Sequence, residues 1–207
     1  GRRLESDYPV QAARVAKATG YPIKMIWSRE EHTRQDFYRP ADTSRFWGGW
    51  DGSGKPVSWN NAFTQLNGPD GSWDVSHYDV PNRSIRHAPA DMHLRFGSLR
   101  SVDYSQQGFF VESFIDELAH AAGKDQVQFC RDFLGAPRII GDPKSRGPYN
   151  TGRMRAVLDK AAAMAGWGRK LPKRTGLGVA FHFSHLGYFA NVIEASVAND
   201  GTVKVHK

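Results

Sequence analysis

The sequence predicts an α+β fold, in which mixed but largely antiparallel sheets pack against helices. Segments with apolar residues at helical spacing stand between short segments of strand character, and Gly- and Pro-containing turns separate them. A chain of 207 residues that is 40% hydrophobic can also bury a sizeable core. We therefore expect one or two ordered domains and little intrinsic disorder.

The first forty residues predict two helices with a strand between them. Apolar positions recur at helical spacing over 7–18, and a Gly-Tyr-Pro sequence then ends this helix. A short apolar strand is expected over 23–27. Ser28 and Glu31 have the spacing of a capping box, which predicts a short second helix that ends before Arg39-Pro40.

The next part of the chain predicts strands and one long loop. Strands over 43–50 and 56–66 flank an Asp-Gly-Ser-Gly turn, and this pattern is typical of a hairpin. Residues 67–79 are rich in Gly, Asp and Ser, which favours a loop. A Pro-Asn turn then leads into two expected strands, over 83–87 and 92–99.

The rest of the chain predicts three helices followed by three strands. The longest helix is expected over 106–122, because its apolar residues share one face and Gly123 follows it. Asp125 is an expected N-cap for a second helix that ends at Leu134. An Ala-rich third helix and the strands follow, over 151–165, 176–183, 188–197 and 202–206.

Residues Gly135 to Asn150 contain several Pro and Gly residues and are not expected to sustain regular structure. The sequence therefore predicts a first lobe over 1–135, a crossover linker over 136–150 and the start of a second lobe over 151–207.

Composition narrows the possible functions. The chain has no apolar run long enough for a membrane span and no secretion signal at its start, so we expect it to be soluble. Its single cysteine, Cys130, excludes an internal disulfide or a cysteine-based metal cluster and is expected to be a buried thiol. The net charge of +7 favours an anionic partner, but the sequence carries no nucleic-acid-binding motif, so we expect no nucleic acid as a partner.

Two segments combine Arg, small residues and a following helix. They are Gly1-Arg2-Arg3 and the stretch 97–102, after which Ser105 is a candidate N-cap. The first turn of a helix offers unpaired N–H groups and a partial positive charge, and an Arg side chain adds a planar fork of donors. Both segments are therefore candidate anion sites, and we expect them to fold toward one anionic ligand. The alternative is that Arg100 is a surface ion-pair partner.

Other polar residues are expected to be structural. His182 and His185 stand three apart in an extended segment, which sends their side chains to opposite faces and makes a poor metal chelate. Glu112, Asp116 and Glu117 lie on one helix, where a solvated face is favoured over a paired-carboxylate acid/base device. We expect no metal ligands from this chain.

Several motifs in this sequence occur in the same order in a known family. They are GRRLESDY at 1–8, WSREE at 27–31, DFYRP at 36–40, RSV at 100–102 and VESFIDELA at 111–119. In this order they resemble the molybdopterin-binding subunits of the xanthine oxidase superfamily, particularly isoquinoline 1-oxidoreductase beta subunits and aldehyde dehydrogenase large subunits. The first motif looks like the continuation of a GGGFGRR loop, so the resemblance implies an internal piece of a longer bacterial subunit.

This resemblance implies a chemistry. Such subunits bind molybdopterin cytosine dinucleotide and oxidise an aldehyde or an aromatic N-heterocycle with oxygen from water. Electrons leave through a small iron–sulfur subunit, which alone carries the clusters, and a cytochrome c subunit is a further candidate partner. The resemblance leaves the compartment open between the periplasm, the membrane and the cytoplasm. A contact segment that binds no cofactor by itself is the alternative function.

The resemblance also implies cofactor-site residues. Gly1 follows the family's Phe in a loop that approaches the cofactor, and Arg2 continues that loop. Arg100 falls on the Arg of an AFRGFG-like loop, where Ser98 and Val102 replace its Ala and its second Phe. Val102 removes an aromatic wall, which implies a pocket different from a purine site.

Asn191, between Ala190 and Val192, corresponds to a small-residue segment beside molybdenum. The family's catalytic Glu belongs to a GE motif beyond Lys207, so no Glu of this chain inherits that role.

Overall fold

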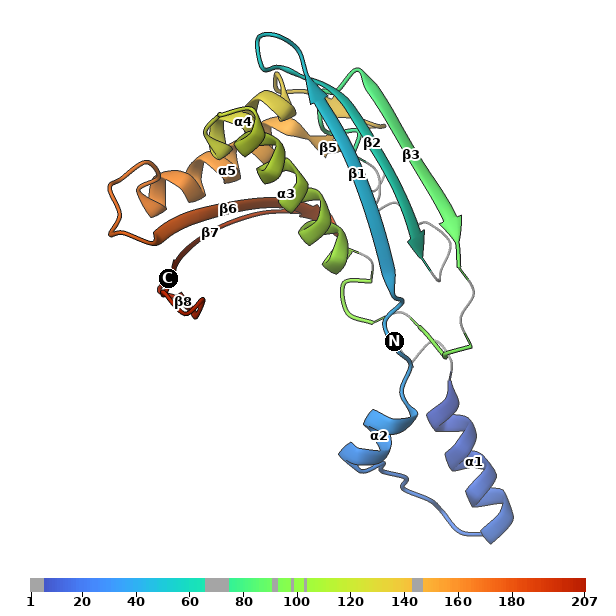
Figure 1. The fold of residues 1–207 in the computed structure, drawn as a ribbon. Helices are drawn as coiled ribbons and strands as arrows, with labels where there is room; N and C mark the ends of the chain where they lie inside the picture. Colours follow the sequence, from blue (N-terminus) through green and yellow to red (C-terminus); the bar gives the residue numbers. More distant parts are fainter. Residues whose placement is uncertain (1–5, 66–74, 91–92, 98, 103, 143–146) are drawn as a thin grey trace.

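The computed structural model describes residues 6–65, 75–90, 93–97, 99–102, 104–142 and 147–207 (Figure 1). Helices and small sheets are combined in them, which confirms the α+β prediction. The helices are α1 (Asp7–Thr19), α2 (Arg29–Gln35), α3 (Tyr104–Ala121), α4 (Gln126–Leu134) and α5 (Thr151–Ala165). The strands are β1 (Asp42–Trp50), β2 (Pro56–Gln65), β3 (Asn82–Pro89), β4 (Ile139–Ile140), β5 (Tyr149–Asn150), β6 (Thr175–Ser184), β7 (Gly187–Val197) and β8 (Val203–Val205).

The sheets are mixed and largely antiparallel, as predicted. β1 and β2 form the expected antiparallel hairpin, and β3 then adds to β2 in parallel. β6, β7 and β8 form an antiparallel meander in which Phe181 lies opposite Ala190. In Figure 1, α3 lies between the β1–β2–β3 sheet and the β6–β7 pair.

Side chains cap α2 and α4 as the sequence predicts. Ser28 Oγ accepts a hydrogen bond from the Glu31 N–H at 3.1 Å, and Asp125 Oδ1 accepts one from the Gln128 N–H at 2.9 Å. Ser105 is not the cap of α3, because that helix already begins at Tyr104 and includes Ser105. The Ser105 hydroxyl instead donates to the Val102 carbonyl oxygen at 3.1 Å.

Three of the expected backbone conformations are wrong. Residues 23–27 form no strand, because an extended segment needs a neighbour to satisfy its backbone, and no ladder partner is present there. The expected strand over 92–99 is reduced, in its described residues, to one bridge between Tyr38 and Phe96. Conversely, the linker over 136–150 contains the short antiparallel pair of β4 and β5. The division into two lobes stays a prediction.

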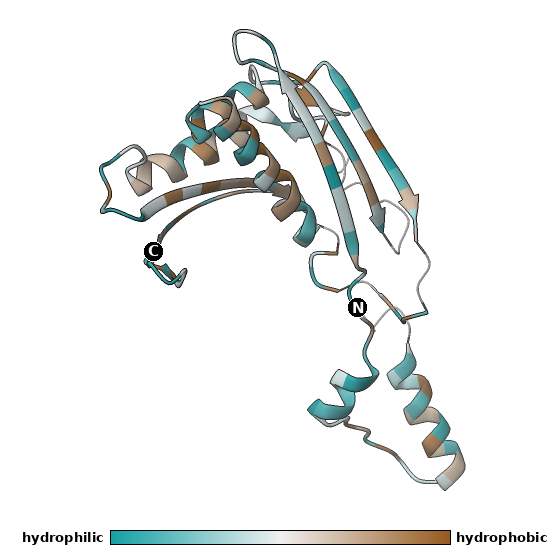
Figure 2. Cartoon of the chain, viewed as in Figure 1, coloured by the Kyte–Doolittle hydropathy of each residue, from teal (hydrophilic) through white to brown (hydrophobic). Residues whose placement is uncertain are grey.

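Helices α1 and α2 lie outside the core. Neither helix contains a buried residue, and α2 is hydrophilic over its whole length (Figure 2). An edge-to-face contact of Tyr8 with Trp27, with ring centroids 5.2 Å apart, joins α1 to the segment before α2. Throughout the described ranges, no helix has the length and apolar character needed to cross a bilayer.

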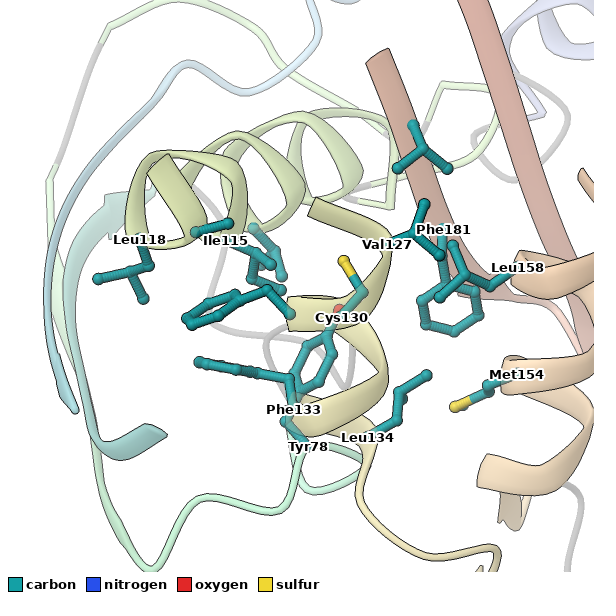
Figure 3. Packing of buried hydrophobic residues seen from close by; sticks show 14 of the residues in the cluster. Tyr78, Ile115, Leu118, Val127, Cys130, Phe133, Leu134, Met154, Leu158 and Phe181 are labelled. Atoms are coloured by element: carbon teal, nitrogen blue, oxygen red, sulfur yellow. The ribbon is translucent and has the colours of Figure 1, made fainter. Parts of the chain in front are cut away.

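The core forms where α3, α4, α5 and β6 meet. Ile115 from α3, Phe133 from α4, Leu158 from α5 and Phe181 from β6 converge in Figure 3, and each is almost fully buried. Cys130 lies in the same cluster, where burial raises the pKa of its thiol well above the usual range, and the expected buried thiol is confirmed. This core includes residues from both sides of the 136–150 segment.

Glu112 is the charged group at the centre of this packing. Its side chain is only 7% exposed, so the expected solvated face is wrong for this residue, although Asp116 and Glu117 are exposed. Glu112 Oε1 accepts from the Tyr78 hydroxyl at 2.7 Å, and Oε2 accepts from the Phe181 N–H at 2.9 Å. Both carboxyl oxygens are thus bonded within the protein.

Together with Gln126, Glu112 closes the free edge of β6. The Gln126 amide donates to the Val179 carbonyl oxygen at 2.8 Å and accepts from the Val179 N–H at 3.2 Å. Two residues along, the Phe181 N–H donates to Glu112. Side chains from α3 and α4 therefore take the place of a further strand, which satisfies backbone groups that would otherwise be buried without partners.

Burial of Glu112 makes stability depend on pH. Burial raises the pKa of Glu112 from 4.5 to about 7, against the opposing effect of its two hydrogen bonds. Between pH 4.5 and about pH 7, Glu112 releases its proton in the unfolded chain but keeps it in the folded protein. The stability of the folded protein therefore falls as pH rises through this range, and the loss of stability is complete above about pH 7. For a group this deeply buried, a shift of this size corresponds to about 3 kcal/mol.

We predict that Glu112→Gln removes this dependence, because an amide resembles the protonated acid but does not titrate. We expect the unfolding free energy of the variant, minus that of the wild type, to increase by about 3 kcal/mol between pH 4.5 and pH 7.5. Urea unfolding at several pH values measures it, with Glu117→Gln on the exposed side of α3 as control. A difference that is independent of pH would contradict the prediction.

Candidate functional site

The loop before α3 is positioned by the DFYRP segment at 36–40. The Tyr38 N–H donates to the Arg95 carbonyl oxygen at 2.9 Å, and the Gly97 N–H donates to the Tyr38 carbonyl oxygen at 3.1 Å. The Arg95 guanidinium carbon lies 4.6 Å from the centroid of the Phe37 ring, in cation–π geometry. These contacts bring two segments that are distant in sequence side by side, immediately before the candidate anion loop.

Arg39 binds this loop with both ends of its guanidinium group. Its Nη1 donates to the Val102 carbonyl oxygen at 2.7 Å, and its Nη2 donates to the Arg100 carbonyl oxygen at 2.8 Å. We refer to residues 99–102 as the Arg100 loop. Sequence reasoning assigned no function to Arg39 and used Arg39-Pro40 only as a helix breaker, although the DFYRP match contained a signal for it.

The Arg100 loop has an unfavourable backbone conformation. Ser101 has a φ of 71° and Val102 a φ of 47°, both in the left-handed region. A β-branched residue such as Val is rarely found there, and each such residue costs about 1–3 kcal/mol. The two hydrogen bonds from Arg39 flank this strained pair and help to hold it. Strain of this kind is concentrated at functional sites, which makes the loop a candidate for one.

Arg100 presents its side chain to the outside of this loop. The residue is exposed, and among the residues that the structure describes no carboxylate lies within ion-pair distance of its guanidinium group. The loop leads directly into the first turn of α3, where the Tyr104 N–H donates to the Ser101 carbonyl oxygen at 3.0 Å. A cation without a carboxylate partner among the described residues thus stands close to the positive end of an 18-residue helix, and the two together favour an anionic ligand.

Asn191 lies in a separate groove. It is exposed on β7 opposite Ala180. The groove, of about 370 Å³, lies between α3 and the β6–β7 pair, and Gly108, Gly178 and Ile193 also line it. No contact within the described part of the chain joins Asn191 to Arg100. A carboxamide exposed in such a groove is accessible to a ligand.

The remaining predicted site residues have different outcomes. Val102 is half-buried in the Arg100 loop. Gly1, Arg2 and Ser98 lie outside the described residues, so the expected convergence of the two Arg-bearing segments stays a prediction. Their roles in binding a cofactor stay predictions too.

His182 and His185 both contact one aromatic ring. Their ring centroids lie 5.9 Å and 5.1 Å from that of Tyr104, at the start of α3. Within the described ranges no three His, Cys, Asp or Glu side chains are grouped so that they could hold a metal ion. The structure thus gives these residues aromatic contacts next to the Arg100 loop.

No family model matches the chain. It is 30% identical over 210 residues to the membrane-bound aldehyde dehydrogenase [pyrroloquinoline-quinone] of Gluconacetobacter polyoxogenes, and the match covers 87% of this chain and 26% of that protein. It is 26% identical over 204 residues to the isoquinoline 1-oxidoreductase subunit beta of Brevundimonas diminuta, with coverage of 87% and 24%. The chain thus spans about a quarter of the length of these curated relatives.

Solved structures share the fold. The aldehyde oxidoreductase of Desulfovibrio gigas (MOP) superposes with a TM-score of 0.57 at 16% identity, over 93% of this chain and 24% of that one. At this identity the likeness concerns the fold alone. The chain is thus similar in sequence to segments of an aldehyde dehydrogenase and an isoquinoline oxidoreductase subunit and shares its fold with a segment of a solved aldehyde oxidoreductase, which supports the resemblance to the xanthine oxidase superfamily.

Proposed function

We propose that this chain is part of a molybdenum hydroxylase subunit that oxidises an aldehyde or an aromatic N-heterocycle and passes the electrons to an iron–sulfur partner subunit. The names of the two sequence relatives support both substrate classes, since one is an aldehyde dehydrogenase and the other an isoquinoline oxidoreductase. The observation that carries the proposal is the Arg100 loop, which Arg39 holds in a strained conformation and whose exposed Arg100 has no carboxylate partner among the described residues.

The residues of this loop fit an anionic cofactor. Molybdopterin cytosine dinucleotide carries a pyrophosphate and an oxo-metal centre, and Arg is the side chain best suited to such oxyanions. When bound, this cofactor supplies the two-electron oxidation with oxygen derived from water. Arg100 is exposed and free of carboxylates in the described part of the chain, so it can bind an anion without first breaking an ion pair.

The other residues have supporting parts in this proposal. Arg39 is a positioning residue, because it contacts the loop backbone through two hydrogen bonds. Val102, where the family pattern has an aromatic residue, leaves more room beside the loop for the substrate. Asn191 offers a carboxamide donor and acceptor from the groove beside α3.

The cofactor itself is open to a direct test. We predict that the intact, purified protein complex contains molybdenum and releases cytosine-containing pterin on acid treatment. Elemental analysis combined with chromatography of the released cofactor measures both. The name of the Gluconacetobacter relative includes pyrroloquinoline quinone. Release of pyrroloquinoline quinone from a complex that contains no molybdenum would contradict the prediction.

The role of Arg39 is tested by Arg39→Lys. The variant keeps the charge but loses the planar fork that reaches both carbonyl oxygens, so the loop is expected to shift. We predict a loss of roughly 10- to 100-fold in kcat/KM for aldehyde or heterocycle oxidation by the intact complex. Arg34→Lys, on the exposed surface of α2, is the matched control and is expected to retain wild-type activity.

A second substitution distinguishes loop geometry from general damage. Ser101→Gly permits the left-handed backbone without strain, so adding it to Arg39→Lys is expected to recover part of the lost activity. If Arg39→Lys leaves both activity and molybdenum content unchanged, the loop has no cofactor role. The alternative of a contact segment without cofactor binding would then be favoured.

A further inference from the structure

A small cavity lies beside the N-terminal half of α3. Its wall includes His77 from the segment before β3, His182 from β6, and Tyr104 and Val111 from α3. The space that the centre of a water molecule can reach is about 20 Å³. A cavity needs about 10–15 Å³ of such space to hold one water molecule.

Two residues of the cavity wall carry buried polar atoms without partners among the described residues. His77 Nδ1 and His182 Nε2 are both buried, and neither has a hydrogen-bond partner among the described residues. A buried polar atom that is left unbonded costs about 1–3 kcal/mol, so a cluster of them calls for a ligand.

The two imidazole rings are neutral in this environment. Burial, with smaller contributions from His182, Arg138 and Arg83, lowers the pKa of His77 to about 3. Burial also lowers the pKa of His182. A neutral ring has one N–H and one lone pair, so each unbonded nitrogen can be either a donor or an acceptor. A ligand that can both donate and accept satisfies either arrangement.

We propose that this cavity binds one buried water molecule, which hydrogen-bonds to His77 Nδ1 and His182 Nε2 and joins the segment before β3 to β6 beside α3. An apolar occupant would leave both nitrogens unbonded. An anion is disfavoured, because the rings are neutral and the Glu112 carboxyl group also lines the cavity. A transition-metal ion needs more ligands than two imidazoles, and no set of three potential ligand side chains occurs in the described ranges.

The water site has a structural consequence for the Arg100 loop. The Tyr104 ring contacts His182, and Tyr104 is the first residue of α3 after that loop. A water molecule that fixes the His182 ring therefore also supports the surface on which Tyr104 rests. This link is independent of the cofactor, so the water site and the proposed function can fail separately.

A crystal structure of the intact protein at better than about 1.8 Å resolution, with anomalous data, tests the proposal directly. The expected result is one density peak within hydrogen-bond distance, about 2.7–3.2 Å, of both His77 Nδ1 and His182 Nε2, without anomalous signal. An empty cavity would overturn the proposal, and so would a peak with the anomalous signal of a metal ion.

Matched variants test which side chains hold the molecule. His182→Phe removes one hydrogen-bonding nitrogen and is expected to lose the density peak, whereas His185→Phe, three residues away and exposed, is expected to keep it. A peak that persists in His182→Phe would contradict the assigned partners. If that variant does not fold, a magnetisation transfer from long-lived water to the Val111 methyl groups in the wild-type protein decides the question, and its absence would overturn the proposal.

Discussion

The free edge of β6 is the constraint on which the rest of the structure depends. The buried backbone groups of a strand edge that packs against helices must find hydrogen-bond partners within the protein. Glu112 from α3 and Gln126 from α4 provide those partners at alternate residues of the strand. Because both helices are held to the edge at fixed register, their apolar residues are directed into one core, which Phe133 and Phe181 fill.

Fixing α3 in this way also fixes the candidate site. The same helix carries Glu112 in its middle and continues directly from the Arg100 loop at its beginning. The loop is therefore bound at one end to a rigid, buried element and on its side to Arg39. A loop held in two directions can keep a left-handed pair of residues that a freely exposed loop would relax, and preorganisation of this kind is what an anion site requires.

Sequence reasoning succeeded where local interactions decide the structure. The caps of α2 and α4 and the β1–β2 hairpin follow from residues within a few positions of each other. It failed where contacts between residues far apart in the sequence decide the structure. Glu112 has the position of a solvated residue by charge alone, and only Tyr78 and Phe181, far away in sequence, make its burial tolerable. Residues 23–27 show the converse, because strand character without a neighbouring strand produces no ladder.

The same distinction between local and long-range contacts applies to the candidate site. Arg100 was predicted as a candidate from a local motif, whereas Arg39 contacts the loop from 61 residues away and required the fold to bring it close. The AFRGFG-like pattern has a glycine where this chain has Ser101, a position that the structure places in the left-handed region. Glycine would adopt this conformation without a clamp, but Ser101 and Val102 do not. In this chain the long-range hydrogen bonds of Arg39 flank the strained pair, so that the DFYRP segment and the Arg100 loop form one structural unit.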